Sequence, residues 1–484
     1  MPRWAATSNV QQTWRERPRL PQTDSSVCPT PERRIRSKAP NVLPEQVNAS
    51  TNRGAANLEL HAASPASPTR RATIFAMKRR SVLKSSLLGF GAALGTQQAR
   101  AALPKMKITR VRYYRSPNQR PIFNQSFNVI VVETDQGITG IGEGGSKDTV
   151  EQLAAMIIGE NPTRIEHLWQ VMYRGYFYPP GREKLHALGG IDMALWDIKA
   201  KALGVPLYEL LGGLTRDHIE CYSTGFPREG TVKETARACM EFGYRAFRTS
   251  AVGPGRGSDG SSFVSQHMVD ETFRHCEQIR EGVGKTGDWA IDYHTRLDLS
   301  DAVRLSTLIE PLAPYFVEDL VRSENPGVYR EVRQKVNVPI AVGEHYGDRW
   351  DANELIENRW IDYSRVTMPN VGGVTEFIKL AALCETHYVG LIPHFTGPIA
   401  TAALVHCCGA SSGPVLMEMT GKGDTEQPHL PHHFDFRKGK LWPNERLGLG
   451  VEFDASKAEL IADITEHSRP TPLYNRPDGS VTNW

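Results

Sequence analysis

The sequence predicts an α/β protein: a (β/α)8 barrel of the TIM type, preceded by an N-terminal α+β capping domain. After Ile219, short apolar runs alternate with amphipathic helical patterns, which is typical of a parallel sheet. Acidic residues end several of these runs, and Asp292, Glu318 and Glu344 follow one another at intervals of 26 residues. One strand plus one helix has this length, so the interval indicates a repeated βα unit.

Composition is that of an ordinary globular protein. The chain has 484 residues, of which 40% are hydrophobic, and is long enough for two domains. A net charge of +3 gives no electrostatic footprint for nucleic acid, so we expect no nucleic-acid partner. The seven cysteines form no C-x-x-C pair and are expected to be buried free thiols.

The first hundred residues read as a targeting region. Residues 1–76 lack a sustained apolar period and are expected to be disordered or not translated. Residues 77–101 combine a basic start, an apolar stretch and a small-x-small cleavage site, and "RRSVLK" resembles the twin-arginine export motif. The apolar stretch is too short for a membrane span. We therefore expect export to the periplasm; a disordered basic tail on a cytoplasmic protein is the alternative.

The capping domain is expected over residues 106–215. "KITRVRYYR" and "NVIVVETDQGITGIGEG" read as antiparallel strands, with a turn at 135–137. Three helical patterns follow, the last being "GGIDMALWDIKAKALGVPLYELLGG", a long helix with glycine on either side.

The barrel is expected over residues 216–430, and residues 431–484 are expected to return to the cap. The strand candidates are "IECYST", "YRAFRTS", "WAIDYH", "YFVEDL", "PIAVGEH", "YSRVT", "GLIPHF" and "PVLMEM". In such a barrel, side chains at the carboxyl ends of the strands meet at one mouth, where catalysis takes place.

Three carboxylates on successive strand ends predict a metal site. Asp292, Glu318 and Glu344 would repel one another as bare anions, whereas a divalent cation would hold them together. Oxygen ligands alone favour Mg²⁺. Each acid by itself could be a helix N-cap or a surface charge, but their equal spacing at the predicted mouth favours the metal site. His294 lies two residues after Asp292, so both side chains point to the same side of the strand.

From these residues the chain is identified as a member of the enolase superfamily, in its mandelate racemase and muconate lactonizing enzyme branch. The resemblance covers about Lys107 to Asp454 and is carried by "GGIDMALWDIKAKALGVPLYELLGG", "AVGEH", "NVGGVTEFIKLAALCE" and "LGLGVEFD". "RIEHLWQVMYRGYFY" is similar to galactonate dehydratases, and "YSRVTMPNVGGVTE" to mannonate dehydratases.

The resemblance implies the residue roles of a Mg²⁺-dependent sugar-acid dehydratase. The three carboxylates match the magnesium ligands, His294 the general acid and His394 the base. Glu418 matches a carboxyl group that, when protonated, helps to hold the substrate carboxylate. Removal of the proton next to that carboxylate and loss of the β-hydroxyl would give a 2-keto-3-deoxy acid. The partner is then a small-molecule sugar acid, and the enzyme is expected to be a homo-oligomer.

The chain departs from this family at three places. Racemases carry Lys-x-Lys at the end of the second strand, where this chain has Arg248, Thr249 and Ser250. Arg248 could hold a substrate oxygen, assist a base or pair with an acid. Many relatives place an Asp beside the seventh-strand His, where this chain has Thr367, a weaker support for an imidazolium. The second-strand loop also lacks the Tyr of mannonate dehydratases.

Other motifs are weaker. "GVGKTG" lacks the first glycine of a phosphate loop, because Ile279 stands there, and reads as a helix end and loop. "HLPHH" could be a metal tract, but its Pro-rich surroundings favour a solvated loop. His345 either lines the site or points away from it. The loop 116–125 and the aromatic residues 176–178 either cover the mouth or belong to the core.

Two other functions stay open. An epimerase or cycloisomerase could use the same proton abstraction with one His base. A catalytically degenerate barrel that binds a sugar acid would keep the metal carboxylates without turnover.

Overall fold

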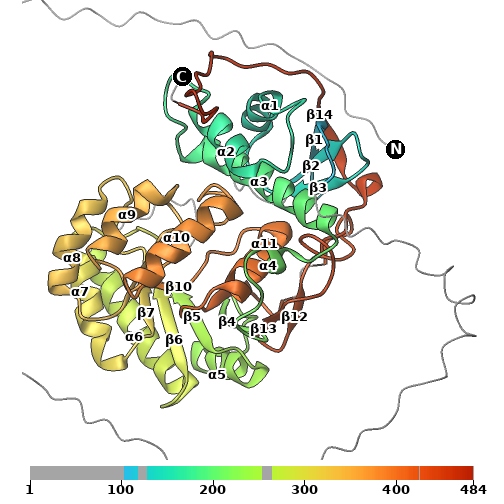
Figure 1. Cartoon of the computed structure of the whole chain (residues 1–484). Helices are drawn as coiled ribbons and strands as arrows, with labels where there is room; N and C mark the ends of the chain where they lie inside the picture. The colour runs from blue at the N-terminus through green and yellow to red at the C-terminus, as the bar shows by residue number, and fades with distance from the viewer. Residues whose placement is uncertain (1–102, 118–127, 253–263, 424–425, 483–484) are drawn as a thin grey trace, which may run out of the picture. The chain divides into compact units, whose positions relative to one another are not determined.

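The computed structural model describes residues 103–117, 128–252, 264–423 and 426–482. The expected barrel is present, with one strand at each of the eight candidate runs (Figure 1). Its strands are β4 (Ile219–Thr224), β5 (Ala246–Ser250), β6 (Asp288–Asp292), β7 (Phe316–Glu318), β8 (Ile340–Val342), β9 (Tyr363–Ser364), β10 (Gly390–Leu391) and β11 (Met417–Thr420).

The strands form a closed parallel ring. Each strand from β4 to β9 pairs in parallel with the next one in the chain. β11 pairs in parallel with β4, and a parallel bridge between Leu391 and Val415 joins β10 to the approach of β11. Because the ring is closed, its interior is a packed core. Tyr222, Ala290 and Phe316 are among the buried side chains of that core.

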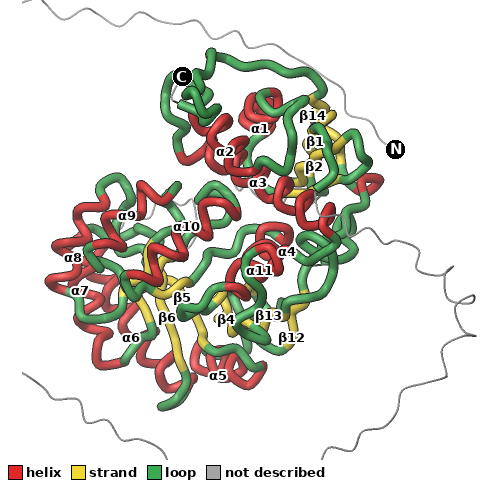
Figure 2. The backbone as a smooth tube through the Cα atoms, viewed as in Figure 1, coloured by secondary structure: helices red, strands yellow, loops and turns green. Residues whose placement is uncertain are grey.

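Helices follow the first seven strands and lie outside the ring (Figure 2). They are α5 (Val232–Phe242), α6 (Ser265–Val283), α7 (Leu299–Ile309), α8 (Tyr329–Lys335), α9 (Arg349–Glu357), α10 (Val374–Thr386) and α11 (Pro398–Ala410), with short 3-10 turns at η2 (Glu310–Leu312) and η3 (Pro326–Val328). After β11 the described residues contain no further α-helix. The hairpin of β12 (Asp435–Arg437) and β13 (Lys440–Trp442) follows, and β13 pairs antiparallel with β4.

The cap combines a four-stranded antiparallel sheet with helices. Its elements are β1 (Ile108–Arg115), β2 (Val129–Thr134), β3 (Thr139–Gly142), α1 (Lys147–Ala155), α2 (Ile165–Arg174), α3 (Arg182–Leu203), α4 (Leu207–Leu210), η4 (Ala455–Lys457) and β14 (Glu459–Ile464). The strand order is β14-β1-β2-β3, so a strand from the end of the chain lies beside the first one (Figure 1).

The long cap helix differs from the sequence expectation. Gly189 and Gly190 were expected to precede it, but α3 begins at Arg182 and runs through both glycines to Leu203. A Cβ atom at Gly189 would lie 2.2 Å from the carbonyl oxygen of Pro369. Gly189 therefore serves close packing of α3 against the barrel and Gly190 close packing against the cap sheet, where a Cβ atom would lie 2.7 Å from Ile130. Gly204 ends the helix in a left-handed conformation, and α4 is separate.

Buried cap carboxylates bind the ends of two barrel helices. Glu143 Oε2 accepts hydrogen bonds from the backbone N–H groups of Ile399 (3.0 Å) and Ala400 (3.4 Å) at the start of α11. Asp192 accepts from the N–H (2.9 Å) and the hydroxyl (2.5 Å) of Thr375 at the start of α10. Thr367 lies between β9 and α10, and His394 lies between β10 and α11. The cap carboxylates therefore bind the two helices that begin just after these candidate site residues.

Two further expectations concern thiols and membranes. The six cysteines of the described residues are free and buried, which confirms that part of the expectation. Among the described helices, none is both long and apolar enough to cross a bilayer. The expected leader at 77–101, and the residues before it, lie outside the described residues.

Candidate active site at the barrel mouth

The three predicted carboxylates lie at neighbouring strand ends. Asp292 and Glu318 are the last residues of β6 and β7 and are directly paired in the sheet register. Glu344 follows β8 by two residues. Asp292 and Glu318 are fully buried, whereas the Glu344 side chain is 11% exposed.

Two arginines connect these carboxylates to Glu418 on β11. One amino nitrogen of Arg248 lies 2.6 Å from Asp292 and 2.9 Å from Glu318. Arg365 follows β9, is fully buried, and donates to Glu318, to Glu344 (3.2 Å) and to Glu418 (2.6 Å). Tyr222 accepts from the same guanidinium at 2.6 Å. We call this set the arginine network: Arg248, Arg365, Asp292, Glu318, Glu344 and Glu418.

Within the arginine network, the pKa values of Glu318 and Glu418 are shifted in opposite directions. Burial raises the pKa of Glu318 well above its usual value, and the two arginines offset this only in part. Burial also opposes ionisation of Glu418, but Arg365 and Arg248 outweigh it and lower the Glu418 pKa to about 2. The resemblance implied a protonated Glu418. The two guanidinium groups that face Glu418 instead favour its ionised form.

His294 contacts Asp292, as their spacing predicts. Its Nε2 lies 2.7 Å from Asp292 Oδ2, and its backbone N–H donates to Asp292 Oδ1 at 2.6 Å. The ring is partly exposed, while its Nδ1 is buried and has no hydrogen-bond partner within the described ranges. His294 also has a positive φ of 50°, a conformation that turns the chain sharply after β6.

His394 lies beside Thr367, the residue that replaces the expected Asp. The Thr367 hydroxyl donates to the carbonyl oxygen of Glu344 at 3.4 Å and lies 3.0 Å from His394 Nδ1. With its proton directed at Glu344, the hydroxyl can accept from Nδ1–H, which leaves Nε2 as the basic nitrogen. Nε2 lies 3.6 Å from Glu344 Oε2. Burial lowers the pKa of His394, which favours the neutral ring.

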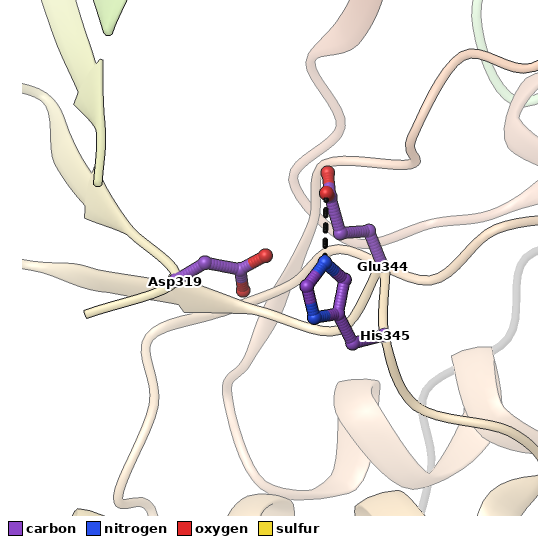
Figure 3. Close-up of side chains that lie close together, drawn as sticks. All are labelled: Asp319, Glu344 and His345. Carbon is purple, nitrogen blue, oxygen red and sulfur yellow. Dashed lines mark ion pairs between the residues drawn. The ribbon is translucent and has the colours of Figure 1, made fainter. Parts of the chain in front are cut away.

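A second group of ligand-type side chains surrounds Glu344 on its outer side. Within the described ranges, Asp319, Glu344 and His345 form the set of three whose ligand atoms lie within 4.8 Å of one another (Figure 3). We call this set the outer cluster. His345 Nε2 is 3.3 Å from Glu344 Oε1, so His345 lines the site. Of the two alternatives for His345 left open by the sequence, the structure supports the one in which its side chain points into the site.

Sequence reasoning missed two residues of this region, Arg365 and Asp319. Arg365 is the charged residue within the apolar "YSRVT" run, and that charge was the available signal. Asp319 alternates away from Glu318 in a regular strand, but its φ of 45° breaks the alternation and turns its side chain toward Glu344. Arg248, whose role was open, pairs with acids in the structure.

The other sequence motifs lie outside the arginine network and the outer cluster. "GVGKTG" spans the end of α6 and the loop before β6, as expected. In "HLPHH", His429 is buried against Phe453, so the expectation of a solvated loop is wrong for that residue. Phe177 and Tyr178 are exposed and pack on each other. Most of the loop 116–125, and 253–263 of the second-strand loop, lie outside the described residues.

The chemistry of the inner carboxylates fits Mg²⁺. Asp292, Glu318 and Glu344 offer oxygen donors alone, as Mg²⁺ prefers. The region also contains more acids than its two arginines can neutralise, since Asp319 and Glu418 add to the three. A divalent cation would reduce that excess.

Comparison with known proteins agrees with this architecture. Residues 108–212 match the mandelate racemase / muconate lactonizing enzyme N-terminal domain, and residues 231–457 match the enolase C-terminal domain-like family. A solved enolase-superfamily member from Salmonella Typhimurium superposes with a TM-score of 0.68 at 27% identity, covering 74% of this chain and 100% of that one. An enolase from Agrobacterium radiobacter, bound to Na and L-malate, gives a TM-score of 0.64 at 27% identity, covering 78% and 99%.

Curated relatives are closer in sequence. D-galactonate dehydratase of Ralstonia pickettii is 35% identical, and that of Pectobacterium atrosepticum is 34% identical. Each alignment covers 78% of this chain and 100% of the relative. The chain therefore belongs to the enolase superfamily, in its mandelate racemase and muconate lactonizing enzyme branch, and is a carbon–oxygen lyase of the dehydratase type.

Proposed function

We propose that the enzyme is a Mg²⁺-dependent dehydratase of an aldonic acid such as galactonate or mannonate. It would remove the proton next to the carboxylate and eliminate the β-hydroxyl, giving a 2-keto-3-deoxy acid. The observation that carries this proposal is the convergence of His294, His394 and three carboxylates at the barrel mouth. Similarity to D-galactonate dehydratases supports the substrate class.

Two histidines would divide the proton transfers. The basic Nε2 of His394, oriented through Nδ1 by Thr367, would take the α-proton. His294, which contacts Asp292 from the neighbouring strand end, would give a proton to the leaving hydroxyl. Such a general acid contributes roughly 10²–10⁴-fold to the rate.

Asp292, Glu318 and Glu344 would hold the metal. A bound Mg²⁺ would supply positive charge next to the substrate carboxylate and so lower the cost of removing the α-proton. Arg248 and Arg365 would remain paired with Glu418, the acid of the arginine network outside the metal set, and so connect β11 to the other strand ends.

The test is a panel of aldonic and aldaric acids, incubated with the full chain and Mg²⁺ and assayed for 2-keto-3-deoxy product. We expect product from one or a few acids, and its loss in Asp292→Asn and His294→Asn. The same reactions run in D₂O report α-proton exchange. Metal binding without product or exchange across the panel would favour the degenerate, sugar-acid-binding barrel.

An epimerase or cycloisomerase is the second candidate. The observation that favours a single-base reaction is the absence of lysine at 248–250, where two-base racemases carry Lys-x-Lys. Deuterium uptake or an isomer without keto product would identify this activity.

We also propose that the enzyme is exported. The basic start, apolar stretch and small-x-small site of residues 77–101 support a twin-arginine leader. N-terminal sequencing of the native protein should find a start near Ala102, whereas a start near Met1 would refute the leader.

A further inference from the structure

The outer cluster differs from the expected magnesium ligands in position and chemistry. Asp319, Glu344 and His345 come from the loops after β7 and β8, and Figure 3 shows the Asp319 carboxylate facing the other two side chains. Glu344 belongs to both groups. Asp319 and His345 have no ion pair with either arginine among the described residues.

Asp319 supplies an independent sign of a ligand. Its side chain is 2% exposed, and its buried Oδ2 has no hydrogen-bond partner among the described residues. A buried, unpaired carboxylate oxygen is costly, so such an atom calls for a ligand. The equally buried hydroxyl of Tyr346 also has no hydrogen-bond partner among the described residues, and Tyr329 is buried nearby. Burial, followed by the charge of Asp319, raises the pKa of both tyrosines, which is consistent with their closeness to this carboxylate.

The two carboxylate oxygens of Glu344 face different neighbours. Oε2 lies toward the barrel interior, 3.2 Å from Arg365 and 3.6 Å from His394. Oε1 lies toward the outer cluster, 3.3 Å from His345 Nε2. One oxygen is therefore available to the inner carboxylates and the other to the outer cluster, as a carboxylate bridging two cations requires.

We propose that Asp319, Glu344 and His345 bind a second divalent cation, separate from the magnesium held by Asp292, Glu318 and Glu344. Two carboxylates and one imidazole favour Mn²⁺ or Zn²⁺ over Mg²⁺, because imidazole suits transition metals. The His345 side chain is 40% exposed, so the site is reached from solvent and leaves positions for water or a substrate oxygen. The site shares Glu344 with the proposed magnesium site but does not depend on the dehydratase activity.

The test counts bound Mn²⁺ in the full chain, by calorimetric titration and by the electron paramagnetic resonance signal of free Mn²⁺. We expect two equivalents in the wild type. Asp319→Asn and His345→Gln should each bind one, and so should Asp292→Asn, which affects the inner site. A preincubation with excess Mg²⁺ should reduce Mn²⁺ uptake by Asp319→Asn more than uptake by Asp292→Asn.

Matched controls separate ligand loss from a general change of charge. Asp298→Asn removes an exposed carboxylate a few residues after His294, and His387→Gln removes a histidine at the end of α10. Both should retain two equivalents. Circular dichroism at the working temperature verifies that each variant is folded.

One equivalent in the wild type, lost in Asp292→Asn and unchanged in Asp319→Asn, would overturn the second site and leave the dehydratase proposal intact. Two equivalents retained in both Asp319→Asn and His345→Gln would overturn it as well. A third outcome separates the two proposals. If the wild type binds two equivalents and each variant binds one, but no sugar acid gives product, the second site is supported and the dehydratase proposal fails.

Discussion

Arg365 is the residue on which the order of the mouth most depends. It is fully buried and pairs with Glu318 on β7, with Glu344 just after β8 and with Glu418 on β11. A buried ion pair need not stabilise a fold relative to apolar residues, but removal of one partner leaves the other charge buried and unpaired. Arg365 therefore offsets part of the cost of burying Glu318 and favours the ionised form of Glu418.

Arg365→Met should lower the free energy of unfolding by about 3–5 kcal/mol, because Glu318 and Glu418 lose their buried partner. Urea denaturation measures this change. The control is Arg322→Met, which breaks an exposed pair with Glu324 and should leave the denaturation midpoint unchanged. Equal midpoints for the two variants would contradict the role given to Arg365.

The Thr367 hydroxyl contacts Nδ1 of His394, and a hydrogen bond accepted from Nδ1–H would leave Nε2 as the basic nitrogen. Thr367→Val removes the hydroxyl 3.0 Å from Nδ1 and should lower kcat about tenfold, while Thr367→Ser should restore it. Steady-state assays on the substrate found in the panel measure both. Thr401→Val is the control, since that buried hydroxyl on α11 has no hydrogen-bond partner in the described part of the chain. A Thr367→Ser variant as slow as Thr367→Val would argue against the hydroxyl.

At this scale, sequence reasoning found residues with a regular spacing and missed those without one. Asp292, Glu318 and Glu344 follow the βα interval, so their meeting at one edge was predictable. Asp319 could not be assigned to the mouth, because its positive φ is set by tertiary contacts. The charge state of Glu418 depends on Arg365, which approaches from a distant part of the chain.

Among the elements, α3 and α10 carry a contact that responds to pH. Burial raises the pKa of Asp192 to about 7, although hydrogen bonds from Thr375 at the start of α10 act in the opposite direction. The unfolded chain releases this proton near pH 4, whereas the folded protein keeps it. The stability contributed by protonated Asp192 is present below pH 4 and is lost as the pH rises through about 7.

The wild type should therefore lose more unfolding free energy than Asp192→Asn between pH 4 and pH 7, by at most roughly 4 kcal/mol. Urea denaturation at several pH values gives both curves. Asp148→Asn, an exposed position in the first turn of α1, should follow the wild type. Parallel curves for wild type and Asp192→Asn would mean that folding leaves the pKa of Asp192 unchanged, which would contradict the raised pKa.

The extent of α3 shows the limit of prediction for elements. Eight barrel strands were recognisable from apolar runs and their spacing, whereas the pair Gly189-Gly190 suggested a helix start. Glycine is a poor helix former, so the local interpretation was reasonable. The helix continues because its close approach to Pro369 requires a residue without a side chain, and that contact is tertiary.

For the molecule as a whole, metal binding should add to stability. The mouth contains more acids than arginines, so a cation that binds the folded state alone raises the unfolding temperature. At a hundredfold excess over its Kd, Mg²⁺ should contribute about 2.7 kcal/mol. Thermal unfolding with Mg²⁺ and with a chelator measures the shift, and Asp292→Asn should lose most of it. An unfolding temperature of the wild type that is the same with Mg²⁺ and with a chelator would contradict the inner magnesium site.

The pairing of β14 with β1 also fixes an order of assembly during synthesis. Arg115 and Glu459, joined by a salt bridge at 2.9 Å, are 344 residues apart in the chain. The ribosome makes every barrel strand before it reaches β14, so the nascent cap carries β1 with an open edge throughout barrel synthesis. A ribosome that stalls after the barrel would thus present a cap sheet one strand short, open to pairing with another chain.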